Sequence, residues 1–276
     1  ASMKRGRNAT ALSEQNPFSF DERVTFDEAR HLYTVDERRA ERSVTSLVKE
    51  AFADNFDPVK IIKKNLFSWR ANQSSKYHQL VVDTEDQEAI DAVVALWNKG
   101  RDSGTQLHKS AELWMNGETP TPGDDLELFK TGWKELQDLG HTACRTELSV
   151  FWGGNDDTTT AGQIDLLTKT KDGYAIVDIK RSDKNLTSDA PSFGRKGAAG
   201  TVFERLDDTP HMRYSLQLSF YAEMFWRLTG EPVTQMLLLQ VDPVNNSVSV
   251  VPCTDLRQEA RSFLSADRGK PSTTDN

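Results

Sequence analysis

Two strand-like segments, TAGQIDLLTKT (160–170) and GYAIVDIKR (173–181), follow one another with only two residues between them. Both are rich in apolar and β-branched residues, which favours strands. A connection this short leaves no room for a crossover, so the two strands must pair side by side as an antiparallel hairpin. Every fold open to this chain therefore contains that hairpin.

The second strand of the hairpin ends in opposite charges. Side chains alternate along a strand, so Asp178 and Lys180 project to one side, and the hairpin brings Asp165 of the first strand beside them. Burying such a set costs several kcal/mol unless a metal ion or an anionic substrate compensates. Two carboxylates on adjacent strands suit Mg²⁺, which prefers oxygen ligands. A D-x-K triplet alone is usually a surface ion pair, so the paired-strand aspartate is what favours a metal site.

The periodicity of the remaining sequence predicts helices around this hairpin. Residues 85–116 repeat apolar positions at intervals of three and four, which predicts one long helix carrying His108, or two helices broken near Gly100 or Gly104. The other elements expected are a hairpin at 24–35, helices within 42–56, 57–66, 124–140, 211–230 and 255–264, and strands at 144–152, 236–242 and 247–253. This order predicts an α/β fold, a central mixed β-sheet flanked by helices with an N-terminal helical portion.

The ends of the chain differ in composition from its middle. Residues 1–20 are polar, aperiodic and basic at their start, which predicts a disordered arm, and residues 265–276 predict a disordered tail. Residues 21–264 contain no repeat or long linker. We therefore expect one domain, with a mainly helical portion over 21–140 and a catalytic α/β core over 141–264.

Charge and cysteine content exclude some classes of protein. A net charge of −8 argues against wrapping nucleic acid over the whole surface, but it leaves a local basic groove open. The chain has no apolar run long enough to span a membrane and no secretory signal. Cys144 and Cys253 lie far apart without CxxC spacing, which excludes a zinc knuckle. We expect an intracellular protein in a reducing compartment, without membrane contact.

Two further segments carry polar residues at suggestive spacing. Gln217 and Tyr221 lie one turn apart on an otherwise apolar helix, which indicates either a functional stripe or a buried glutamine bonded to the sheet. The Gly-rich loop SFGRKGAAGTVFER carries Arg195, Lys196 and Arg205, which suit a phosphate backbone or, equally, a solvated loop. A third segment, KIIKKNLFSWR (60–70), interleaves lysines with aromatic residues that could stack on bases, although its tryptophan is slightly favoured as core.

The motifs occur in a recognisable order. They are G-T-x-x-H (104–108), Glu147 on the first strand, G-x-I-D (162–165), V-D-I-K (177–180) and Q-L-x-x-Y (217–221). Over residues 24–264 the chain resembles the PD-(D/E)XK nuclease superfamily, in the branch of RecB-type exonuclease domains, and is similar to members from phages and large DNA viruses. It departs from the family pattern in Gly162-Gln163-Ile164, where a proline is nominal, and in Asp178, where many members have glutamate.

The resemblance implies a restriction-endonuclease-like core and roles for individual residues. It implies that His108, Asp165, Asp178 and the Ile179 carbonyl hold Mg²⁺ or Mn²⁺, and that Lys180 is the catalytic lysine. Gln217 and Tyr221 match a helical motif that supports the site and contacts the substrate phosphate in relatives, and Glu147 matches an auxiliary acid.

The expected function is therefore hydrolysis of DNA phosphodiester bonds by a metal-dependent exonuclease that acts on ends or single strands in replication, recombination or repair. Two alternatives stay open: an endonuclease on RNA or branched DNA, and a non-catalytic DNA-binding or assembly module of the same fold. The presence of His108, Asp165, Asp178 and Lys180 together favours the enzyme. Some members of the superfamily form ring-shaped oligomers, but no segment here marks an interface.

Overall fold

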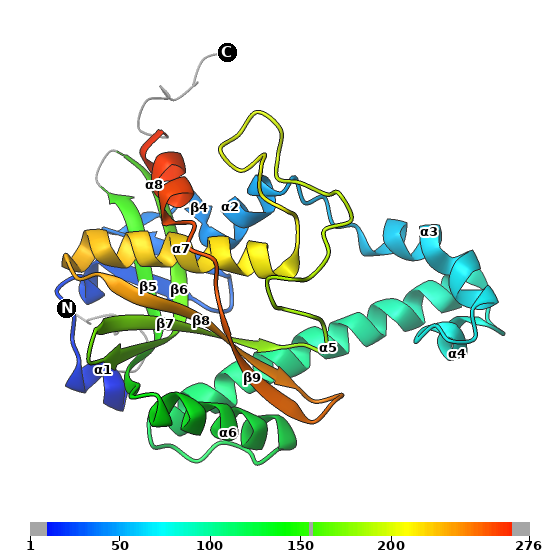
Figure 1. Ribbon diagram of the computed structural model, residues 1–276, viewed down its shortest axis with the longest axis horizontal. Coiled ribbons are helices and arrows are strands. Elements are labelled where there is room, and N and C mark those ends of the chain that lie inside the picture. The colour runs from blue at the N-terminus through cyan, green and yellow to red at the C-terminus, as the bar shows by residue number, and fades with distance from the viewer. Residues whose placement is uncertain (1–9, 155–156, 267–276) are drawn as a thin grey trace. The chain divides into compact units, whose positions relative to one another are not determined.

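Helix α7 lies across one face of a mixed β-sheet, and α6 covers the opposite face (Figure 1). The computed structural model describes residues 10–154 and 157–266. Its elements are α1 (Ala11–Gln15), a short 3₁₀ helix η1 (Asp21–Arg23), β1 (Val24–Asp27), β2 (Leu32–Val35), β3 (Arg38–Arg39), β4 (Arg42–Ser43), α2 (Val44–Ala51), α3 (Pro58–Ala71), α4 (His78–Val81), α5 (Asp86–Met115), α6 (Asp124–Asp138), β5 (Thr142–Gly154), β6 (Asp157–Thr170), β7 (Gly173–Arg181), α7 (Pro210–Thr229), β8 (Val233–Asp242), β9 (Ser247–Pro252) and α8 (Arg257–Ala266).

The hairpin that the sequence requires is β6–β7, and it forms the centre of the main sheet. β6 pairs antiparallel with both β5 and β7, β7 pairs parallel with β8 through the α7 crossover, and β8 pairs antiparallel with β9. The short β4 adds a parallel pair to β6. The expected α/β fold with a mixed sheet flanked by helices is confirmed, and β1 and β2 form the predicted hairpin at 24–35, extended by β3.

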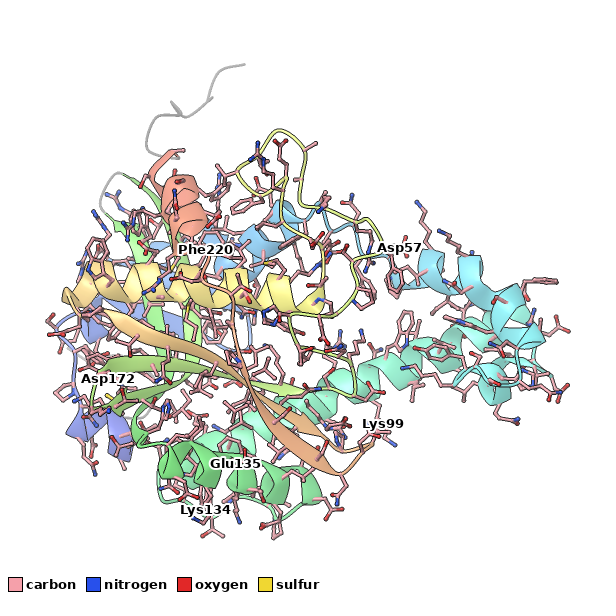
Figure 2. All side chains as sticks on the ribbon, viewed as in Figure 1. Asp57, Lys99, Lys134, Glu135, Asp172 and Phe220 are labelled. Carbon is pink, nitrogen blue, oxygen red and sulfur yellow. The ribbon has the colours of Figure 1, made fainter. Side chains whose placement is uncertain are left out.

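Alternation along β8 divides the core between the two faces of the sheet. Leu238 belongs to the cluster that includes Phe220 of α7, which is fully buried and is labelled in Figure 2. The next residue, Leu239, lies against Gly132 of α6. Burying a side chain of this size contributes about 1.5–3 kcal/mol, so helices on both faces stabilise the sheet.

The chain divides into two compact units, and residues 54–107 form the smaller one. Its core contains Ile62 and Leu66 of α3, Val81 of α4, and Ile90 and Val93 of α5. The sequence predicts no such division, because all these helices show the same amphipathic period. Helix α5 is one unbroken helix, with open space around Gly100 and Gly104, and its last turns from His108 belong to the larger unit.

The predicted disordered arm is wrong for residues 10–20. Thr10 and Ser13 form a capping box that begins α1, and the Leu12 amide donates to Asn116 Oδ1 at 3.0 Å. Phe20 is buried, and the Phe18 ring meets the Phe225 ring edge-on at 5.5 Å between centroids. These aromatic side chains bury enough apolar surface to order the segment. Residues 1–9, with the basic start of the arm, and 267–276, most of the predicted tail, lie outside the described residues.

In the part of the chain that the structure describes, no helix combines the length and apolar character needed to cross a bilayer.

Close approach of α7 to β6 requires the absence of a side chain at Gly162. A Cβ built there would lie 2.5 Å from Tyr221 Cε1 and 2.8 Å from Val44 Cγ2. We predict that Gly162→Ala lowers the free energy of unfolding by about 1–3 kcal/mol, because the ring or the strand must move. Gly100→Ala, in open space on α5, is the control and should raise stability by up to about 1 kcal/mol. Urea unfolding measures both, and an unchanged midpoint for Gly162→Ala would contradict the close contact.

Candidate metal centre

The backbone pairing of the β6–β7 hairpin stops where the two aspartates begin. Leu166↔Val177 is the last pair of the ladder at this end, so Asp165 and Asp178 come next on the two strands. The Ile179 amide donates to Asp165 Oδ2 at 2.8 Å. A carboxylate thus replaces a main-chain acceptor, and the strands open into a fork lined by two acids.

His108 of α5 reaches into this fork and contacts both strands. Its Nε2 lies 2.7 Å from the Ile179 carbonyl oxygen, and its Nδ1 lies 3.4 Å from Asp165 Oδ1. Both partners are acceptors, so both ring nitrogens carry protons and the side chain is an imidazolium. Burial lowers the pKa of His108, but the Asp165 carboxylate more than offsets this and the pKa is raised to about 9. Burial likewise raises the pKa of Asp165, yet His108 shifts it below its ordinary value overall.

Glu147 of β5 completes a cluster with His108 and Asp165. It lies between the pairs Thr146↔Leu166 and Leu148↔Ile164, which places it opposite Asp165. One ligand atom from each of the three residues lies within 4.8 Å of the other two. Glu147 has φ of 48°, a left-handed conformation that is uncommon for a residue with a side chain and is found at functional sites. The strand therefore turns out of regular geometry at this acid.

Gln163 holds the strained backbone in place. Its Nε2 donates to the Glu147 carbonyl oxygen at 3.0 Å. Gln163 and Asp165 are two residues apart on β6, so their side chains project to the same side of the strand. Gln163 supports the backbone of Glu147, and Asp165 faces His108. Gln163 was not among the predicted site residues, although the period of two in G-x-I-D places it on the same side of β6 as Asp165.

Asp178 pairs with the lysine two residues further along β7. Lys180 Nζ lies 2.7 Å from Asp178 Oδ2, an ion pair in which the side chains are 19% and 3% exposed. Burial raises the pKa of Asp178 to about 6. Burial alone would lower the pKa of Lys180, but the neighbouring Asp178 carboxylate raises it above its ordinary value, so Lys180 stays an ammonium.

Helix α7 closes the site with three polar side chains. The Tyr214 ring centroid lies 4.6 Å from Lys180 Nζ, a cation–π contact. Gln217 Nε2 donates to Tyr221 Oη at 2.9 Å, and burial raises the pKa of the Tyr221 phenol well above its ordinary value. The predicted pair on the helical stripe therefore forms, within the helix rather than to the sheet. Tyr214, three residues before Gln217, was recognisable only by that spacing.

These residues can hold a metal ion. His108, Glu147 and Asp165 form a partly buried cluster of nitrogen and carboxylate ligands. The buried Asp178 Oδ2 beside them is neutralised by the Lys180 ammonium, 2.7 Å away. Of the ligands predicted from the sequence, the fork brings His108, Asp165 and the Ile179 carbonyl together. Glu147 enters the cluster itself, and Asp178 lies in the ion pair with Lys180.

The predicted substrate-contacting residues lie on the loop between β7 and α7. Arg195, Lys196 and Arg205 are all exposed. Lys196 Nζ pairs with Asp207 at 2.7 Å, and Arg195 Nε donates to the Ser192 carbonyl oxygen at 3.2 Å. The buried Phe203 anchors the loop, and its backbone packs so closely on Gly197 that no side chain fits there.

Comparison with known proteins adds little. No protein-family model and no curated protein matches the chain. A solved structure described as "Crystal structure of SSO0001" matches with a TM-score of 0.27 and 13% identity, over 51% of this chain and 56% of that one. The chain thus spans little more than half the length of that protein, and a likeness this weak carries no argument.

The His108–Asp165 pair makes stability depend on pH. The pKa of His108 is raised from 6.5 to about 9, so its stabilisation is complete below pH 6.5 and disappears as the pH rises through about 9. We predict that, in EDTA, the stability advantage of the parent over His108→Gln is largest near ~pH 6 and shrinks toward ~pH 10. Urea unfolding of both proteins across this range measures it. An advantage that stays constant with pH would rule out the charged pair.

Proposed function

We propose that this chain is a metal-dependent nuclease that hydrolyses DNA phosphodiester bonds. The observation that carries the proposal is the fork of β6 and β7, where a ligand cluster of His108, Glu147 and Asp165 lies beside the buried Asp178–Lys180 ion pair. The resemblance of its motifs to the PD-(D/E)XK superfamily supports the same assignment. Within that superfamily, the RecB-type motifs favour an exonuclease on DNA ends or single strands in replication, recombination or repair.

Mg²⁺ or Mn²⁺ suits this site because its ligands are mainly carboxylate and carbonyl oxygens. Such an ion, when bound, polarises the scissile phosphate and lowers the pKa of a bound water. Asp165 is fixed for this task by the Ile179 amide, and Glu147 by the hydrogen bond from Gln163 to its backbone. His108 would join the ligands as a neutral imidazole, after it gives up one of its two ring protons.

Lys180 supplies positive charge beside the ligands. Asp178 and the Tyr214 ring hold its ammonium, and its side chain is only 19% exposed, so little water screens it. An ammonium held in this way can orient the attacking water and offset negative charge that develops on the phosphate. Gln217, half-buried and hydrogen-bonded to the buried Tyr221 hydroxyl, is a further polar side chain of α7 that could support the site.

Two alternatives have specific consequences. An endonuclease on RNA or branched DNA would use the same metal site, because the ligands do not contact the sugar. A DNA-binding or assembly module would keep the fold without turnover. The left-handed conformation of Glu147 within the ligand cluster supports catalysis over assembly. Free Cys144 and Cys253 agree with the proposed reducing, intracellular location.

We predict that the protein shortens end-labelled DNA only with Mg²⁺ or Mn²⁺, and that Asp165→Asn reduces cleavage to background because a metal ligand is lost. The assay compares single-stranded DNA, duplex DNA and RNA, with EDTA as the blank. Asp172→Asn, at the exposed turn between β6 and β7 (Figure 2), is the matched control and should cleave like the parent. A ladder from one labelled end would identify an exonuclease. Intact substrates with a folded parent protein would favour the assembly module.

We predict that Lys180→Ala lowers the cleavage rate about 10²–10³-fold while divalent-metal binding persists, because Lys180 is a charge beside the ligands and not one of them. Cleavage rates and calorimetric Mn²⁺ titration separate the two effects. Lys171→Ala, at an exposed lysine, is the control. Gln217→Ala and Tyr221→Phe should be milder, by roughly tenfold. Cleavage by Lys180→Ala at the parent rate would remove Lys180 from the mechanism.

A further inference from the structure

Helix α3 of the smaller unit exposes a row of lysines and one aromatic ring. Lys60, Lys63, Lys64 and Phe67 follow the spacing of a single helix face, and all four are exposed. Phe67 is 86% exposed, the largest exposed fraction among the large apolar side chains described. We call these four residues the lysine stripe.

Two other residues of the segment KIIKKNLFSWR (60–70), Trp69 and Arg70, have a structural role and do not belong to the stripe. Arg70 donates from Nε to the Val81 carbonyl oxygen at 2.9 Å and from a terminal nitrogen to Asp86 at 2.6 Å, so it joins α3 to the next two helices. Trp69 packs in the core of the unit, 4.2 Å from the Tyr77 ring between centroids. Arg70 and Trp69 therefore have a structural role within the unit, whereas the residues of the lysine stripe have none.

No acid is paired with the stripe lysines in the part of the chain that the structure describes. Asp57, at the start of α3 (Figure 2), accepts from the Lys60 backbone amide and not from its ammonium group. Some exposed lysines elsewhere are paired, such as Lys134 with Asp138 at 3.0 Å and Lys196 with Asp207 at 2.7 Å. The stripe differs from single unpaired lysines because three of them lie within five residues on one helix, in a chain whose net charge is −8.

We propose that the lysine stripe binds the phosphate backbone of a nucleic-acid strand, with Phe67 stacking on an unpaired base. The inference rests on the proposed nuclease function and adds a nucleic-acid contact outside the metal centre. From Lys60 to Phe67 the helix rises about 10.5 Å, at ~1.5 Å per residue. In a stacked, B-like strand, with an axial rise of ~3.4 Å per nucleotide, that length spans about three nucleotides.

The same stripe does not suit a membrane surface. A helix that lies on a bilayer buries a broad apolar face in it. The apolar face of α3, with Ile62 and Leu66, is already buried in the core of its own unit. A single exposed ring among lysines fits a sequence-tolerant contact to single-stranded nucleic acid.

The test is binding of a fluorescent single-stranded DNA to the full chain in EDTA, over a range of salt concentrations. The triple substitution Lys60→Gln, Lys63→Gln, Lys64→Gln should weaken binding about 10–100-fold at low salt and reduce the slope of log K against log salt by about 2, because about 0.7 counterions are released per phosphate contact. Phe67→Ala should weaken binding about 5–100-fold without changing that slope. The triple Lys→Arg variant should bind like the parent.

A matched control keeps the charge change but moves it elsewhere. Lys99→Gln, Lys134→Gln, Lys171→Gln alters three exposed lysines on α5, on α6 and in the β6–β7 turn, and should retain the affinity and slope of the parent. In cleavage assays with Mg²⁺ the stripe variant should show a raised KM and an unchanged kcat on a short substrate. This split distinguishes a binding surface from damage to the metal centre.

The outcomes separate the stripe from the nuclease. If the parent cleaves DNA and the stripe variant binds with the same affinity and slope, the stripe proposal is wrong and the nuclease proposal stands. If the parent neither binds nor cleaves nucleic acid, both are wrong. If the stripe variant loses only its binding to phosphatidylserine vesicles, the stripe is a membrane contact and the proposal is overturned.

Discussion

Two carboxylates at the open end of one hairpin are the constraint on which the rest of the site depends. Asp165 and Asp178 follow the last backbone pair of β6 and β7, and like charges so placed repel each other strongly away from water. Two positively charged side chains offset this repulsion. His108 lies against Asp165, and Lys180 lies against Asp178. The neighbouring carboxylates raise the pKa of His108 and of Lys180, so both side chains stay positively charged.

Those pairings determine which other elements must approach the fork. His108 belongs to α5, so the last turns of that helix are fixed against β6 and β7. Tyr214 and Tyr221 belong to α7, and α7 can come this close only because position 162 is a glycine. The α7 crossover, Gly162 and the end of α5 thus all help to place charged and polar side chains around the two aspartates. Residues 54–107 have a hydrophobic core of their own and contribute no side chain to the metal centre. The exposed face of that unit can therefore carry lysines without paired acids.

Local patterns in the sequence predicted the fold well and the site in part. The period of two in the β6 and β7 segments and the two-residue connection between them determine the hairpin, and with it the closeness of Asp165 and Asp178. The position of Glu147 as a full member of the cluster could not be predicted, because it depends on a left-handed backbone and on the side chain of Gln163. The order of residues 10–20 was missed for a similar reason: Phe18 and Phe20 find partners distant in sequence.

Protons and a divalent cation compete for the same oxygens at this fork. Protonated His108 donates to the Ile179 carbonyl and faces Asp165, which are the oxygens that a hard cation prefers. An imidazolium cannot ligate a metal, so binding must release a proton, and the affinity for metal must rise with pH. Lys180 escapes this competition, because its ammonium is fixed on Asp178 and is not a ligand. One cation of the fork is therefore exchangeable and the other permanent, which is the division that the proposed nuclease mechanism requires.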